Sequence, residues 1–380
     1  MKITVKMRVI AGFLTISLLL VIISISSLYN LNSVGSATEE VNELALPTVS
    51  GSNALKASFL NMGRLTFESY ITEEVSELEK KEASFNESRA NFEREYGILE
   101  GVVSDDPELS KTLNNVKSAY DSYIGNADDM YKSHRAFMDM RNEISDKQSS
   151  AEDNADDAAT LLLDFSDTSA VANSDALQSA ADIGSNLETS LLSLLTVSTE
   201  YAKTQTLLRA QTIGNEVELL VSKVAEQLSN MMQEADGADT TGMLEEVNEL
   251  VGDALNAITA DDGVLKLHVN RLEFRNNAEK ALGRSDDNIK QGIVELEKLL
   301  GLADARAKSI DEQVSDKVAS GTVVVVVVVA ISLLIAAAIG YFTVIAISRP
   351  LYRVNELLNI ASSGDLTHRL DDSAQDEFGQ

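Results

Sequence analysis

Two long apolar runs divide the sequence into three parts. The first run extends from Val9 to Ile25, and the second extends from Thr322 to Ile347. A helix of about 20 residues crosses a hydrocarbon core of about 30 Å, so each run is long enough to span a membrane. We therefore predict a two-pass membrane protein with most of its residues between the two spans.

Charged residues beside the two runs indicate the orientation of the chain. Lys2, Lys6 and Arg8 precede the first run, whereas Arg349 and Arg353 follow the second. Because positive residues next to a span remain in the cytoplasm, we predict that both ends are cytoplasmic and that the region between the spans lies outside the cytoplasm. No Ala-x-Ala-like cleavage site follows the first run, which favours an uncleaved anchor over a signal peptide.

Between the runs, apolar residues recur at alternating steps of four and three. One such register extends from Leu109 to Phe165, and another extends from Val251 to Val314. This heptad spacing is typical of long helices packed in bundles or coiled coils. Shorter helices are predicted at 36–71, 73–99, 172–203 and 205–235, with turns at 105–107 and 236–239.

The order of these helices is the same in both halves, with two short helices and then a long one. As a helix, 36–99 would be about 95 Å long and 107–165 about 88 Å, so two short helices stacked end to end would match one long helix returning beside them. We therefore predict an all-α fold of two stacked four-helix bundles, with one nearly continuous helix over 240–347. The segments HRAFMDMR (134–141) and HVNRLEFR (268–275) both place His and Arg seven residues apart, which supports a duplication.

Composition excludes several classes of function. The net charge is −29, and all of it lies between the spans because the two tails hold six basic and six acidic residues. Such an acidic surface disfavours nucleic acid and anionic lipid as partners. The sequence has no cysteine and three histidines, so we predict no disulfide, no metal site and no cofactor. No residue pattern marks a nucleophile with its base, so the chain is predicted not to be an enzyme.

Several arginine and histidine side chains fall on the apolar seams, where unpaired charges are costly. Mutual pairing, for example of Arg275 with Glu279, would explain them, and so would a ligand cavity. Counting about 1.5 Å per residue from the two turns places four polar side chains at one level: Arg64, Arg141, Tyr201 and Arg275. Guanidinium groups at that level suit a small carboxylate. The candidate ligand-binding residues are Asn61, Arg64, Arg141, Tyr201, His268, Arg271 and Arg275.

The tail after the second run resembles the HAMP linker of bacterial transmembrane receptors. Pro350 follows the span at a predicted helix start, Gly364-Asp365-Leu366 ends an amphipathic stretch, and residues 376–379 are DEFG. Together with the two spans and the helical outer region, this tail makes the chain resemble a methyl-accepting chemotaxis protein with a helical bimodular sensor domain, cut within HAMP.

The predicted organisation has five parts: a cytoplasmic N-terminus at 1–8, a transmembrane helix at 9–29, a periplasmic ligand-binding domain at 30–319, a second transmembrane helix at 320–347 and a partial HAMP linker at 348–380. The resemblance further implies a homodimer in the bacterial inner membrane, with a chemotaxis kinase and an adaptor as partners through a cytoplasmic domain beyond Gln380.

The resemblance also bears on the ligand. Members of that sensor family bind small organic acids, and Arg64 and Arg271 resemble two of the arginines that bind them. Asn61 stands where acid-binding members carry a further arginine, so a ligand of another class stays open. We interpret the chain as a chemoreceptor that senses a small solute and passes a helix displacement through HAMP.

Two other functions fit the same layout. The input half of a sensor histidine kinase or of a cyclase would differ in the domain that comes after Gln380, where a chemoreceptor has a long methylatable coiled coil. A structural stalk would bind no ligand, and a metabolite panel would not shift its thermal melt.

Overall fold

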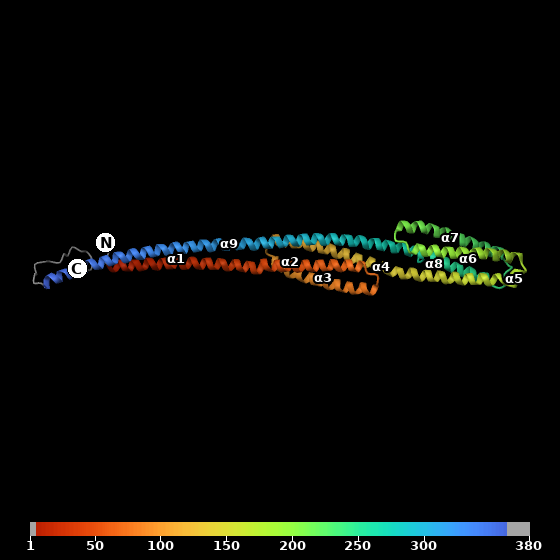
Figure 1. Ribbon diagram of the computed structural model, residues 1–380, viewed down its shortest axis with the longest axis horizontal. Helices are drawn as coiled ribbons and strands as arrows, with labels where there is room; N and C mark the ends of the chain where they lie inside the picture. Colours follow the sequence, from red (N-terminus) through yellow and green to blue (C-terminus); the bar gives the residue numbers. More distant parts are fainter. Residues whose placement is uncertain (1–4, 363–380) are drawn as a thin grey trace. The chain divides into compact units, whose positions relative to one another are not determined.

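The structure is a computed structural model that describes residues 5–362, and all regular secondary structure in that range is helical. The predicted all-α fold is therefore confirmed. The elements, shown in Figure 1, are α1 (Val5–Glu40), the π-helical segment η1 (Val41–Ala45), α2 (Leu46–Tyr70), α3 (Val75–Val103), α4 (Pro107–Ser166), α5 (Ser169–Ala172), α6 (Asp175–Ala202), α7 (Leu207–Glu234), α8 (Met243–Thr259) and α9 (Val264–Ser362).

Local capping explains where several helices begin. The Asp106 carboxylate accepts hydrogen bonds from the backbone N–H groups of Glu108 (3.0 Å) and Leu109 (3.1 Å), and Pro107 occupies the first position of α4. Both features stabilise a helix N-terminus because its first N–H groups lack intrahelical partners. Hydroxyl caps begin α6 and α7 in the same way, at Ser174 and Thr206.

Residue contacts divide the chain into two compact units. The first unit comprises Met1–Ser50, Val102–Leu109 and Leu299–Gln380, and the second comprises Gly51–Gly101 and Ser110–Lys298.

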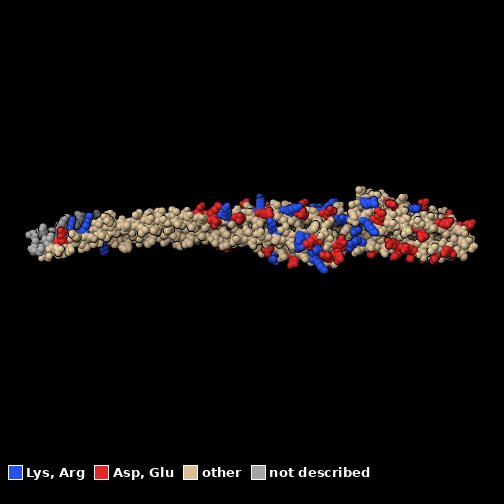
Figure 2. Space-filling view, viewed as in Figure 1, with Lys and Arg blue, Asp and Glu red and all other residues tan. Residues whose placement is uncertain are grey.

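The first unit contains two segments that are long and apolar enough to cross a membrane. The most apolar windows have a mean hydropathy of 2.6 within Val9–Tyr70 and 3.1 within Met243–Glu356, and only 6% and 0% of these windows are buried. A core helix of a soluble protein buries its apolar side chains, so this exposure favours contact with lipid. Figure 2 shows that the visible face over most of α1 carries almost no charged side chains.

In the second unit, a first four-helix bundle is built from α2, α3, the N-terminal part of α4 and α9. Its core is aromatic: the rings of Phe92 and Tyr120 stack with centroids 4.0 Å apart, and Phe59 stacks on Phe92 at 5.4 Å. Asn126 on α4 donates to Asn288 on α9 at 2.8 Å. Aromatic pairs of this kind add to the stability that their burial already provides.

A second four-helix bundle is built from the C-terminal part of α4, from α6 and α7, and from α8 with the start of α9. One cluster of buried apolar residues joins these helices; its members include Ile144, Phe165, Leu187, Val217, Val251 and Leu272. Because α4 and α9 contribute to both bundles, they are helices that the two bundles share. The fold class predicted from the heptad spacing is thus what the structure contains.

The path of the chain through the bundles differs from the prediction. Asn61 on α2 donates to Ser88 on α3 (2.7 Å), and Lys81 on α3 pairs with Glu68 on α2 (3.3 Å), so the two helices are antiparallel and not stacked end to end. The helices α6 and α7 form a second antiparallel hairpin around residues 203–206. Amphipathic helices bury more apolar surface side by side than end to end, which helix lengths alone did not reveal.

The nearly continuous helix predicted over 240–347 is present apart from one break. A turn at 260–263 separates α8 from α9, and the backbone N–H of Gly263 donates to the carbonyl of Ala260 at 2.8 Å. A Cβ at Gly263 would lie 2.8 Å from backbone atoms of Ile258, so the turn requires glycine there. The turn at 260–263 has four residues, which is close to the 3.6 residues of one helical turn. The apolar spacing therefore continues from α8 into α9, and the sequence pattern does not reveal the break.

The predicted helix start at Pro350 is likewise wrong, because Pro350 lies inside α9, which continues to Ser362. The other HAMP landmarks, at 364–366 and 376–379, lie outside the described residues.

Candidate ligand-binding site

In each hairpin, a buried histidine makes a hydrogen bond to the turn between the two helices. In the first repeat, the Nε2–H of His134 on α4 donates to the Thr72 carbonyl at 2.9 Å. In the second repeat, Nε2 of His268 on α9 lies 2.8 Å from the Thr204 hydroxyl. Both imidazoles are buried, and Thr72 and Thr204 occupy equivalent places after α2 and α6. The duplication predicted from the two octapeptides therefore has a structural counterpart.

The arginine seven residues after each histidine holds the next residue of the same turn. Arg141 Nη2 donates to the Glu73 carbonyl at 3.2 Å. Arg275 Nη1 donates to the Gln205 carbonyl at 3.5 Å and to its side-chain Oε1 at 2.5 Å. The two turns are thus fixed by matching pairs of side chains.

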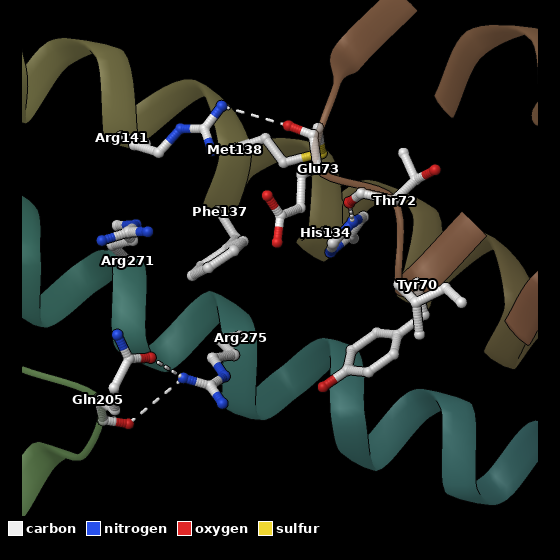
Figure 3. A pocket seen from close by; sticks show the side chains of 11 residues that line it. Tyr70, Thr72, Glu73, His134, Phe137, Met138, Arg141, Gln205, Arg271 and Arg275 are labelled. Atoms are coloured by element: carbon white, nitrogen blue, oxygen red, sulfur yellow. Dashed lines mark hydrogen bonds between the residues drawn. The ribbon is translucent and has the colours of Figure 1, made fainter. Parts of the chain in front are cut away.

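A cavity of about 310 Å³ lies where the two turns meet α4 and α9 (Figure 3). Its walls come from both repeats; the lining residues are Tyr70, Ile71, Thr72, Glu73, His134, Phe137, Met138, Arg141, Gln205, Arg271 and Arg275. A space of this size is at the lower end of the range for small-molecule sites in proteins.

Arg271 is the third arginine of the cavity and is half-buried. Its guanidinium lies over the ring of Phe137, 4.6 Å from the centroid, and its Nε is buried without a hydrogen-bond partner among residues 5–362. Burial, and then repulsion from Arg141 and Arg275, lower the pKa of Arg271 from its ordinary value. The cavity therefore contains a guanidinium group whose charge is not fully compensated by the side chains around it.

The charge balance of the cavity favours an anion. Three arginines face one carboxylate, that of Glu73, and none of these four residues forms an ion pair within 4.0 Å of another described residue. Guanidinium groups bind carboxylates through paired, charge-assisted hydrogen bonds. The excess of two positive charges in a partly enclosed space is suited to a small acid.

The two histidines have a structural part in this site. Burial lowers the pKa of His134, and burial together with repulsion from Arg271 lowers that of His268 to about 4. Both imidazoles are therefore neutral at neutral pH. A neutral His134 uses its Nε2–H on the Thr72 carbonyl, so it fixes the turn and adds no charge to the cavity.

The structure brings together three of the seven predicted ligand residues, namely Arg141, Arg271 and Arg275. Tyr201 and His268 lie behind the cavity and do not line it. The Tyr201 hydroxyl donates to the carbonyl of Leu265 at 2.8 Å, and its ring packs edge-on against His268 with centroids 5.0 Å apart. Their contacts support the α6 turn.

Arg64 and Asn61 lie away from this cavity. Arg64 donates to Asn61 Oδ1 (2.9 Å) and to Glu68 (2.5 Å). It lines a separate, mostly apolar cavity of about 670 Å³ between α2 and α9. The count along the sequence put Arg64 at the level of the other arginines because it assumed stacked helices; in the hairpin, α2 ends at Tyr70, about 9 Å beyond Arg64.

Sequence reasoning missed the turn residues of the site. Glu73 and Gln205 belong to no heptad register, and each meets an arginine 68 or 70 residues away along the chain. A signal was present, since both turns follow a tyrosine and contain a threonine, in YITEE (70–74) and YAKTQ (201–205). Within residues 5–362, no three His, Cys, Asp or Glu side chains lie close enough together to hold a metal ion.

Comparison with known proteins gives a family match and several similarities to solved structures. Residues 2–187 match a family model described as a four helix bundle sensory module for signal transduction. The sensor domain of the V. parahaemolyticus histidine kinase sensor TorS is 12% identical, with 70% of this chain and 99% of that chain covered and a TM-score of 0.45. The TorS sensor domain in its complex with TorT in the presence of TMAO is 13% identical, with 71% and 99% covered and a TM-score of 0.45. No curated protein sequence matches the chain.

Proposed function

We propose that the chain is a two-pass chemoreceptor that senses a small organic acid. The match of residues 2–187 to a family model of four-helix-bundle sensory modules for signal transduction supports this proposal. The sensor region faces the periplasm of a bacterium, and the two apolar segments anchor it in the inner membrane. The signal passes through a HAMP linker to a chemotaxis kinase and its adaptor, and the receptor works as a homodimer.

The observation that carries this proposal is the convergence of Arg141, Arg271 and Arg275 on one cavity. The Nε of Arg271 is buried and has no hydrogen-bond partner in the part of the chain that the structure describes, and Arg141 and Arg275 use only part of their hydrogen-bonding capacity on the two turns. A bound carboxylate would accept hydrogen bonds from these groups and relieve their mutual repulsion. Each charge-assisted bond contributes about 1.5–3 kcal/mol, which is enough to select an acid over a neutral solute.

The continuity of α9 supports the relay. Arg271 and Arg275 lie near the start of α9, and the same helix contains the apolar window and ends at Ser362. A ligand that draws these arginines towards itself favours one position of α9 over another. A signal requires such a difference in affinity between two states, because equal binding to both would shift nothing.

The proposal is tested by thermal melts of the chain in detergent micelles, followed by circular dichroism at 222 nm. The panel contains acetate, succinate, serine and putrescine, so that acids, a zwitterion and an amine are compared. An acid at 100 times its dissociation constant should stabilise the folded state by about 2.7 kcal/mol. Stabilisation by putrescine alone, or by none of the four, would reject an acid-sensing receptor.

A further inference from the structure

The cavity contains one carboxylate of its own. Glu73 is the single acidic residue among the described residues that line it, and its carboxylate points into the cavity (Figure 3). The residue lies in the turn that joins α2 to α3. An acid group inside an anion-binding cavity needs an explanation, because it opposes the binding that the three arginines favour.

The two repeats differ at this position. The equivalent residue in the second repeat is Gln205, whose side-chain oxygen accepts a hydrogen bond from Arg275 at 2.5 Å. Glu73 holds Arg141 through its backbone carbonyl only, and its carboxylate forms no ion pair within 4.0 Å among the described residues. The Glu73 carboxylate is therefore not needed to fix its own turn, whereas the Gln205 side chain takes part in fixing the other.

We propose that the Glu73 carboxylate lies in the part of the cavity that the ligand's acid group takes and determines which anions bind. This inference rests on the proposed function and assigns a specificity-determining residue to the same site. A bound acid displaces the Glu73 carboxylate from the cavity. Because the carbonyl of Glu73 is held by Arg141, that displacement acts on the turn between α2 and α3 and so reports occupancy to both helices.

The charge of Glu73 also sets the preference among acids. The negative charge of Glu73 lowers the affinity of the cavity for every anion. It repels a ligand with two carboxylates more strongly than a ligand with one. At the separations possible within so small a cavity, one added negative charge weakens the binding of a dianion such as succinate by about tenfold when the site is partly open to water, and it weakens the binding of a monoanion by less. Removing that charge should therefore favour dianions more than monoanions.

The test is isothermal titration calorimetry of succinate and of acetate with the whole chain in nanodiscs of zwitterionic lipid. Glu73→Gln removes the charge and keeps the shape. Glu74→Gln is the matched control, because Glu74 is the next residue of the same turn, is exposed as Glu73 is, and does not line the cavity. Circular dichroism is used to check that the unchanged chain and the two variants have the same helix content.

We expect Glu73→Gln to bind succinate about tenfold more tightly than the unchanged chain and to gain less for acetate, whereas Glu74→Gln should bind both acids as the unchanged chain does. Binding by Glu73→Gln alone would also support the inference. If the unchanged chain binds succinate and Glu73→Gln binds it equally well or less well, the role of Glu73 is overturned while acid sensing stands. If neither protein binds either acid, the proposed function fails and the inference with it.

Discussion

Replacing Arg271 by methionine separates ligand binding from folding, because the two effects are expected to differ in size. Burial of Arg271, and its repulsion from Arg141 and Arg275, disfavour the charged form of its guanidinium group. An apolar side chain of similar length removes that cost. It also removes the contact with the Phe137 ring, which is worth about 0.5–1 kcal/mol. Since Arg271 is only half-buried, these opposing terms nearly cancel, and we expect the free energy of unfolding to change by less than about 1 kcal/mol.

The effect of Arg271→Met on acid binding should be much larger. The change removes the charge-assisted hydrogen bonds that a carboxylate would accept from this guanidinium, at about 1.5–3 kcal/mol. This corresponds to an affinity lower by roughly 10-fold to 150-fold. Urea unfolding of the chain in micelles measures the first effect, and calorimetry with succinate measures the second.

Arg284→Met is the matched control for this prediction. Arg284 is an exposed residue of the same helix and lines neither cavity. Its replacement should change neither the affinity nor the unfolding free energy appreciably. A loss of more than about 2 kcal/mol of stability in Arg271→Met, with unchanged affinity, would show that Arg271 is a structural anchor and would refute the reasoning.

The remaining predictions concern the buried histidine of the second repeat and two glycines. Burial lowers the pKa of His268 to about 4 in the folded state. The unfolded state therefore binds more protons than the folded state below about pH 6.5. The free energy of unfolding should fall by on the order of 3 kcal/mol as the pH is lowered from 7 to 4. Urea midpoints at several pH values check this, and His268→Gln should flatten the slope between pH 6.5 and 5; an unchanged slope would contradict the assignment. Gly263→Ala should destabilise the fold by about 1–3 kcal/mol, because the new Cβ would meet the backbone of Ile258. Gly252→Ala inside α8 should stabilise the fold by up to about 1 kcal/mol, because no described atom lies within 4 Å of the new Cβ. Equal effects of the two glycine changes on the melting temperature would reject this account of the turn.

Much of the fold could be predicted from the sequence because its strongest signals are local. Heptad spacing gave the long helix from 107 to 165 almost to the residue, and Asp106-Pro107 gave its start. The direction in which successive helices pack is not local. Stacked and antiparallel arrangements of α2 and α3 satisfy the same apolar pattern, and contacts such as Asn61 with Ser88 decide between them.

The candidate site was predictable only where it lies on a helix. Arg141 and Arg275 stood out because charged residues on an apolar seam need partners and because the two octapeptides match. Glu73 and Gln205 lie in turns, where no periodicity marks a residue, and their proximity to the arginines depends on how the hairpins close. The ligand functions of the seven residues chosen from the sequence stay predictions.

A crystal structure of the chain with bound succinate would test the central claim most directly. The account predicts difference density for a carboxylate within about 3.2 Å of nitrogen atoms from at least two of Arg141, Arg271 and Arg275, with the Glu73 side chain turned out of the cavity. Density for the acid beside Arg64 instead, between α2 and α9, would contradict it.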